Sequence, residues 1–355
     1  MRYQGIKVTL VTGFLGAGKT TLIRHLLEQS PPHERWAVLV NEFGDIGLDS
    51  AFYADLDIAI TEVPGGCVCC TTSAAFQKGL NQLIRQYNPD RIFIEPSGLG
   101  HPKQIIQKLR SPTYHDVLLL TGTFCVLDAR HLSDERYTKH TIFNDQIASA
   151  NGIVFSHVDQ YTPKDVALID ATFAACSQGE VKPAIFLSDP MALSENALDV
   201  SLSDSVAYSA IRYKALENEH DHPHSKPAPP HESQDTVGQI HHDQPLFLQQ
   251  GFAPQRHYHK QQDGMQVVGW QWSKTHYFDA DAVTTAVNEM LKLDAIYRIK
   301  GVFVTQSGQA LFVNAARGAL TMSQAMWLQD SRLEIIGVAA EDWSKAIIEG
   351  YADLF

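Results

Sequence analysis

The chain has 355 residues, enough for two domains, with a normal globular balance of 44% hydrophobic and 19% charged residues. Its net charge of −12 argues against a nucleic-acid partner, which would require a basic face. A small anionic ligand stays compatible with this charge, because backbone N–H groups can bind phosphate against an acidic background.

The N-terminal half alternates short apolar runs with helical patterns. The run before Gly13 is too short for a signal-peptide core, and no segment approaches the ~18 apolar residues of a membrane helix. We therefore expect a cytosolic protein without a membrane partner. Alternating strands and helices predict an α/β fold with a mostly parallel sheet. Strands are expected at 6–12, 36–41, 91–95, 117–127 and 152–155, with helices at 21–29 and 74–87. The second helix should bury one apolar face, formed by Phe76, Leu80, Leu83, Ile84 and Tyr87.

The alternating pattern stops near Asn218. Residues 218–245 are polar and rich in proline and histidine, which is typical of an exposed linker. Beyond it, strand-like runs and two helical patterns predict a small α+β domain, with helices over 278–292 and 341–355. The expected division is a P-loop domain at 1–217, a linker at 218–245 and an α+β domain at 246–355.

The stretch from Gly13 to Thr20 fits the phosphate-loop motif G-x-x-x-x-G-K-[ST], between a predicted strand and a predicted helix. Glycines allow the backbone to turn its N–H groups toward phosphate oxygens. The lysine is expected to reach the β/γ-phosphates as a catalytic cation, and the threonine hydroxyl to bind Mg²⁺. The nucleotide-binding candidates of this loop are Gly13, Gly16, Gly18, Lys19, Thr20 and Thr21.

A P-loop enzyme also needs an acid at the end of a neighbouring strand, to organise Mg²⁺ or water. Glu95 follows the apolar run RIFI and is the preferred candidate. Gly98 lies three residues further on and could offer its amide to the γ-phosphate. Asp128 occupies a similar strand end and is the competing acid.

Base recognition is expected where the run GIVF ends. Guanine sites commonly use Asn-Lys-x-Asp, and the stretch here is Ser156-His157-Val158-Asp159. Asp159 fits in place and in chemical type, whereas His157 replaces the lysine that packs on the base. A histidine ring could stack there instead. GTP is modestly favoured over ATP.

Three of the five cysteines lie within four residues, at Cys67, Cys69 and Cys70. Three thiolates suit Zn²⁺ or Cu(I), and Gly65-Gly66 would allow the turn that makes them converge. The alternatives are a redox pair of Cys67 and Cys70 or small buried residues.

Four motifs occur in the order GFLGAGKTT, NEFG from Asn41, GGCVCC and EPSG from Glu95. Through these motifs and their order, the sequence resembles the CobW-type family of P-loop GTPases, which is implicated in metal delivery. The resemblance implies GTP and Mg²⁺ as ligands and zinc as the commonest metal.

The resemblance also assigns roles to individual residues. The three cysteines match the metal-binding C-x-C-C motif, Glu95 and Gly98 match the Walker B region, and Asp159 matches the guanine-binding aspartate. Glu42 lies in the matching switch region and is a further catalytic candidate. His157 departs from the family pattern.

The function expected from these motifs is a GTP-hydrolysing metal chaperone that transfers zinc to a client protein. Since the cysteines lie between the phosphate loop and Glu95, where GTPases keep their switches, hydrolysis would change metal affinity. The alternatives are a P-loop small-molecule kinase and a passive zinc store. The linker histidines could add weak metal buffering. The client and a homo-oligomeric state are left open.

Overall fold

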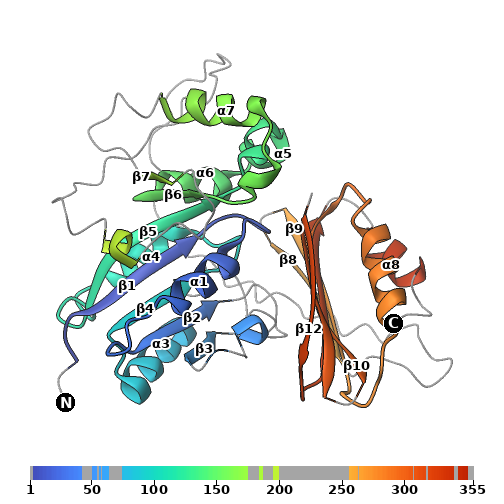
Figure 1. Cartoon of the computed structure of the whole chain (residues 1–355), viewed down its shortest axis with the longest axis horizontal. Helices are drawn as coiled ribbons and strands as arrows, with labels where there is room; N and C mark the ends of the chain where they lie inside the picture. The colour runs from blue at the N-terminus through green and yellow to red at the C-terminus, as the bar shows by residue number, and fades with distance from the viewer. Residues whose placement is uncertain are drawn as a thin grey trace, which may run out of the picture.

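The structure is a computed structural model, and it places two sheet-based domains beside each other (Figure 1). Glu42, the three clustered cysteines and the predicted linker at 218–245 lie outside the described residues. The described residues are 3–41, 50–53, 56, 58–63, 74–174, 184–186, 195–199, 256–262, 264–306, 308–316, 319–339 and 343–350.

The N-terminal domain contains a 7-stranded sheet in the order β3-β2-β4-β1-β5-β6-β7. Every neighbouring pair is parallel, which confirms the predicted α/β class. Because β1 lies between β4 and β5, the loop after β1 opens between the ends of those two strands. The strands are β1 (Ile6–Thr12), β2 (Trp36–Asn41), β3 (Ala59–Val63), β4 (Arg91–Glu95), β5 (Leu118–Leu127), β6 (Gly152–Phe155) and β7 (Ala184–Phe186).

Helices cover both faces of this sheet. One face packs against α1 (Lys19–Glu28), with the 3₁₀ turns η1 (Ser50–Tyr53) and η6 (Glu195–Asp199) beside it. The other face packs against α3 (Ala74–Tyr87) and α4 (Pro102–Leu109), and further along against α6 (Thr141–Ala148). The remaining elements are η2 (Ala129–Ser133), α5 (Glu135–Thr138), η3 (Val158–Gln160) and α7 (Pro163–Ala174).

The predicted apolar face of α3 is buried except at its last residue. Phe76, Leu80, Leu83 and Ile84 have at most 4% of their surface exposed, whereas Tyr87 is 45% exposed. The prediction for Tyr87 was wrong because the helix ends at that residue, beyond the edge of the packed layer.

The C-terminal domain is a 6-stranded antiparallel sheet in the order β12-β11-β10-β13-β9-β8. The sequence did not predict β8 or β12, the two edge strands: β8 is mostly polar, and polar residues interrupt the apolar run of β12. The strands are β8 (Arg256–Gln262), β9 (Met265–Trp272), β10 (Ile296–Gln306), β11 (Gln309–Ala316), β12 (Ala319–Met326) and β13 (Ser331–Val338), and the helices are α8 (Ala280–Met290) and α9 (Trp343–Gly350).

The two faces of the C-terminal sheet have different partners. One packs on α8 and α9, and Figure 1 shows α8 on the side of this sheet away from the N-terminal domain. The opposite face meets the phosphate loop, where Phe14 and Leu15 share a hydrophobic cluster with Val267, Tyr297 and Ile336. Burying this apolar surface holds the second domain against the predicted nucleotide site.

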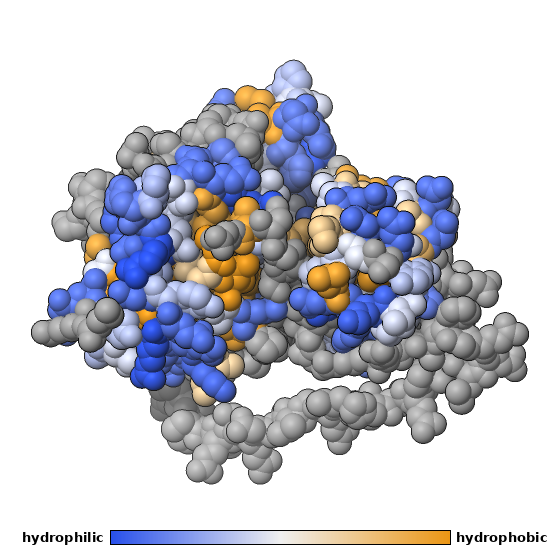
Figure 2. All heavy atoms as spheres, turned by 60° about the horizontal axis from the view of Figure 1, so that its bottom comes forward, coloured by the Kyte–Doolittle hydropathy of each residue, from blue (hydrophilic) through white to orange (hydrophobic). Residues whose placement is uncertain are grey.

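The face drawn in Figure 2 is mostly hydrophilic, with a compact hydrophobic area on the larger domain. The most exposed large apolar side chains are Met326 and Leu328, at 73% and 71%. Within the described residues, the helices are too short or too polar to cross a membrane.

Candidate nucleotide site

The phosphate loop begins where β1 ends and leads directly into α1. Its glycines Gly13, Gly16 and Gly18 all have positive φ, at 146°, 74° and 95°. A Cβ on Gly13 would lie 2.4 Å from the carbonyl oxygen of Val126, so only glycine fits against β5. Gly18 is the N-cap of α1, so the positive end of the helix opens at this loop.

Lys19 is buried within the loop, with only 4% of its surface exposed. Its Nζ donates to the carbonyl oxygens of Gly13 at 2.9 Å and Phe14 at 3.3 Å. Burial and, after it, the charge of Arg298 lower the pKa of Lys19 to about 8, while Glu95 opposes the change. The amine is thus held inside the loop, close to where phosphates bind in P-loop proteins.

Thr20 and Glu95 come together at the start of α1. The Thr20 hydroxyl donates to Oε1 of Glu95 at 2.7 Å, and the Tyr53 hydroxyl donates to Oε2 of the same carboxyl at 2.6 Å. All three side chains are buried. Hard oxygen donors from a hydroxyl and a carboxylate fit Mg²⁺, which favours few protein ligands beside phosphate oxygens.

Tyr53 is a site residue that the sequence analysis missed. It lies in η1, whose sequence carries no motif. Burial and the adjacent Glu95 raise the pKa of Tyr53, so its hydroxyl remains a donor. Its neighbour Phe52 faces the other domain, with its ring 5.8 Å from that of Phe312 and 4.8 Å from Nζ of Lys300.

Gly98 packs directly against the phosphate loop. A Cβ there would lie 2.9 Å from the backbone nitrogen of Leu15 and 2.8 Å from its Cδ2. The carbonyl oxygen of Gly98 accepts from Nε2 of Gln146 in α6 at 3.0 Å. The turn after Glu95 is therefore fitted between the phosphate loop and α6.

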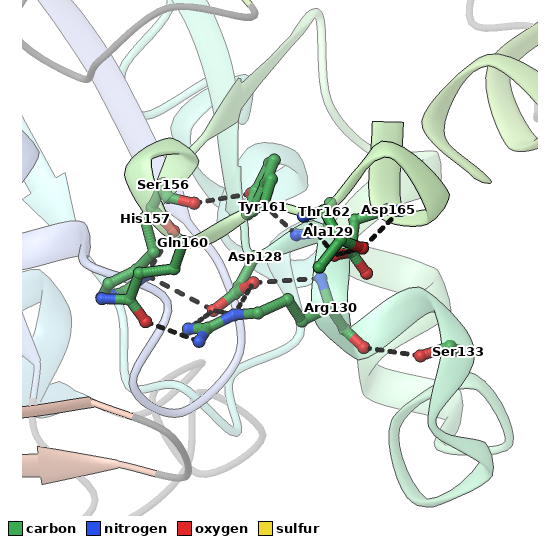
Figure 3. Close-up of polar contacts among 10 residues, drawn as sticks. All are labelled: Asp128, Ala129, Arg130, Ser133, Ser156, His157, Gln160, Tyr161, Thr162 and Asp165. Carbon is green, nitrogen blue, oxygen red and sulfur yellow. Dashed lines mark hydrogen bonds and ion pairs between the residues drawn. The ribbon is translucent and has the colours of Figure 1, made fainter. Parts of the chain in front are cut away.

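Asp128, the competing acid, is engaged in a different contact (Figure 3). Its carboxylate accepts from Nε of Arg130 at 3.0 Å and from Nη2 at 2.6 Å, and it caps the start of η2. Nδ1 of His157 lies 3.4 Å from the same carboxylate. Hydrogen bonds and charge from Arg130 lower the pKa of Asp128, although its burial opposes this. Between the two strand-end acids, Glu95 is the one bonded to Thr20.

The Ser156–Asp159 stretch lies beside the phosphate loop. A Cβ on Gly18 would be 3.5 Å from that of Ser156, whose backbone oxygen accepts from the hydroxyl of Tyr161 at 2.6 Å (Figure 3). His157 adopts φ 55°, which reverses the chain into η3 and leaves Asp159 exposed. An exposed carboxylate is able to accept hydrogen bonds from a base.

Aromatic rings pack against Phe14 of the phosphate loop. The ring of Phe14 lies 5.5 Å from that of Tyr137, which stacks on His131 at 3.8 Å with planes 6° apart. Burial lowers the pKa of His131 to about 4. Phe14 also meets Tyr297 of the C-terminal domain at 6.4 Å. The loop conformation thus depends on both domains.

The cysteines that the sequence predicts as zinc ligands lie outside the described residues. Among the described residues, no three side chains of His, Cys, Asp or Glu gather closely enough to hold a metal ion. Cys125 is buried, and burial raises the pKa of its thiol to about 12.

Fold and site together define a P-loop nucleotide-binding protein with an antiparallel second domain. Residues 7–180 match the CobW/HypB/UreG nucleotide-binding domain, and residues 267–350 match the cobalamin synthesis protein cobW C-terminal domain. The chain therefore belongs to the CobW family of P-loop GTPases.

Two relatives from Escherichia coli (strain K12) illustrate the similarity. The zinc chaperone YeiR is 34% identical over 351 residues, covering 95% of this chain and 95% of the relative. The zinc chaperone YjiA is 37% identical over 163 residues, covering 43% of this chain and 50% of the relative. The crystal structure of Zn(II)-bound YjiA GTPase aligns over 100% of both chains, at 19% identity and a TM-score of 0.40. That likeness is weak, so family membership rests on the sequence matches.

Proposed function

We propose that this protein hydrolyses GTP and couples the nucleotide cycle to the transfer of zinc to a client protein. The observation that carries the proposal is the buried contact of Thr20 with Glu95 beside Lys19. It occurs in a chain that is 34% identical, over 95% of both lengths, to a protein named as a zinc chaperone.

In this proposal each nucleotide-binding residue has a separate task. Lys19 leaves the loop carbonyls and binds the β/γ-phosphates, while Thr20 and Glu95 hold Mg²⁺. Bound Mg²⁺ would neutralise phosphate charge. Asp159 accepts from the guanine edge, and Glu42 is a catalytic residue of the switch region.

The cargo site consists of Cys67, Cys69 and Cys70, which the C-x-C-C pattern assigns to zinc. Three protein thiolates leave a fourth position for a group from the client. Because these cysteines lie between the phosphate loop and Glu95 in the chain, nucleotide and zinc affinities are expected to be linked reciprocally. The tasks divide between a GTPase domain at 1–217 and an α+β domain at 246–355, joined by the linker at 218–245.

The test measures GTP turnover and zinc affinity of the full chain, with Lys19→Ala and Cys69→Ala as matched variants. The proposal expects Lys19→Ala to lose turnover and keep zinc. Cys69→Ala should lose tight zinc and the effect of zinc on turnover, while still binding GTP.

Three results contradict the proposal in different ways. Zinc binding without GTP turnover by wild type would identify a passive store. Transfer of the γ-phosphate to an added acceptor would identify a kinase. Nucleotide affinity that is unchanged by zinc would remove the coupling.

A further inference from the structure

Charged side chains are buried on the face of the C-terminal sheet that meets the N-terminal domain. Arg298 and Lys300 of β10 are 9% and 2% exposed, and Glu334 of β13 is 4% exposed. Lys300 pairs in register with Glu334, and Arg298 precedes it by two residues on the same face. Burying charge is costly, so such a group calls for a ligand or a structural partner.

The start of β10 lies at the phosphate loop. Arg298 is the register partner of Ala316 in β11. A Cβ on Gly16 would lie 2.0 Å from the Cβ of Ala316, so loop and strand are in direct contact. Tyr297, the residue before Arg298, has its ring 6.4 Å from that of Phe14 in the loop. Arg298 is therefore bracketed by two residues that contact the loop.

Electrostatics agrees with this placement. The charge of Arg298 lowers the pKa of Lys19, while that of Glu95 raises it. Two cations held near each other in a buried site repel. A bound triphosphate is an anion and would attract both Lys19 and Arg298.

An acid, Glu334, belongs to the same cluster. Burial raises the pKa of Glu334, although its bond from the Tyr258 hydroxyl and the charges of Arg298 and Lys300 act against this.

We propose that Arg298 is a phosphate-binding residue of the nucleotide site, contributed by the C-terminal domain. Its guanidinium binds the terminal phosphate alongside Lys19, because a planar fork of donors suits phosphate oxygens. During hydrolysis, water forms the new P–O bond while the bond to the GDP oxygen breaks, giving GDP and phosphate. Arg298 donates hydrogen bonds to the phosphoryl oxygens and forms no covalent bond. This role rests on the proposed GTPase function.

The test compares Arg298→Ala and Arg298→Lys with the wild-type full chain. Arg332→Ala is the matched control, since Arg332 lies on β13 with its guanidinium 5.7 Å from the Trp327 ring. Each protein is titrated with GDP and with a non-hydrolysable GTP analogue in the presence of Mg²⁺, and GTP turnover is measured separately. The titration is repeated with the corresponding adenosine nucleotides, so that a preference for adenine over guanine does not obscure the result.

Arg298→Ala should lose affinity for the triphosphate analogue by about tenfold more than for the diphosphate. Its turnover should fall by about a hundredfold or more. Arg298→Lys should recover part of the binding and little of the turnover, because a lysine lacks the fork. Arg332→Ala should stay within about twofold of wild type in both measurements.

An Arg298→Ala protein with the wild-type ratio of triphosphate to diphosphate affinity overturns the role. That ratio also separates phosphate binding from simple domain docking, which would change both affinities equally. Should Arg298→Ala fail to fold, Arg298→Lys with unchanged turnover is the overturning result. Wild type that binds triphosphate but does not hydrolyse it refutes the proposed function, and the affinity ratio still decides Arg298. Binding of neither nucleotide series refutes both.

Discussion

Replacing His131 by phenylalanine should remove a large part of the acid sensitivity of the N-terminal domain. His131 is 8% exposed and stacks on Tyr137, which in turn supports Phe14 of the phosphate loop. A phenylalanine ring keeps the stacking and cannot take up a proton. The substitution therefore separates packing from titration.

The magnitude follows from the two protonation equilibria of His131. Burial lowers its pKa from 6.5 to about 4 in the folded protein. Between these values the unfolded chain binds more protons, so stability rises with pH and is lost as the pH falls from 6.5 to 4. Lowering the pH from 7 to 5 should cost about 2 kcal/mol through this residue alone.

Neighbouring charged groups also shift the pKa of His131. Asp128 raises its pKa and Arg130 lowers it, with smaller contributions from His157 and Asp134. The pKa values of both aspartates are lowered from 3.8, so they protonate below this window. Other histidines contribute equally to wild type and variant, so the difference between the two proteins isolates His131.

The assay is urea unfolding of both proteins at pH 7, 6 and 5, with the free energy of unfolding extrapolated to water. The wild-type protein should lose about 2 kcal/mol more than His131→Phe between pH 7 and pH 5. Equal losses in the two proteins would refute the assignment of this pH dependence to His131.

Three further changes test other parts of the molecule. Gly16→Ala places a methyl on a residue with φ 74°, 2.0 Å from the Cβ of Ala316, and should cost about 2–4 kcal/mol in urea unfolding; a stability equal to wild type would contradict the contact. Tyr53→Phe removes the donor to Oε2 of Glu95 and should cost about 1–3 kcal/mol, with a higher Mg²⁺ requirement for turnover; an unchanged Mg²⁺ titration would show that the hydroxyl does not position the carboxyl. Deleting 218–244 should leave the tight zinc site intact in equilibrium dialysis, and its loss would assign that zinc to the linker histidines.

The parts of the fold that could be predicted are those encoded locally. The run from Ile6 to Glu28 carries a buried strand, a glycine loop and a helix in one continuous stretch, and Glu95 ends an unbroken apolar run. These patterns predicted the α/β class and the family, which the comparisons confirm. The roles of the individual site residues stay predictions.

The rest depended on contacts between segments far apart in the sequence. Tyr53 lies in a short turn without a motif, and only the tertiary fold places its hydroxyl on Glu95. Arg298 belongs to a strand whose pattern predicts a sheet and says nothing of the phosphate loop beside it. The edge strands β8 and β12 escaped prediction because an edge needs no continuous apolar face.

Phe52 and Tyr53 are consecutive residues that connect two separate surfaces. Tyr53 is bonded to the acid of the proposed Mg²⁺ site, while Phe52 lies between Lys300 and Phe312 of the second domain. A hybrid protein that combines this N-terminal domain with the C-terminal domain of a relative must therefore preserve the complement to Phe52. A replacement sheet without residues that fit Phe52 should shift η1, and with it the contact of Tyr53 with Glu95. Exchanging η1 together with the sheet should restore the hybrid.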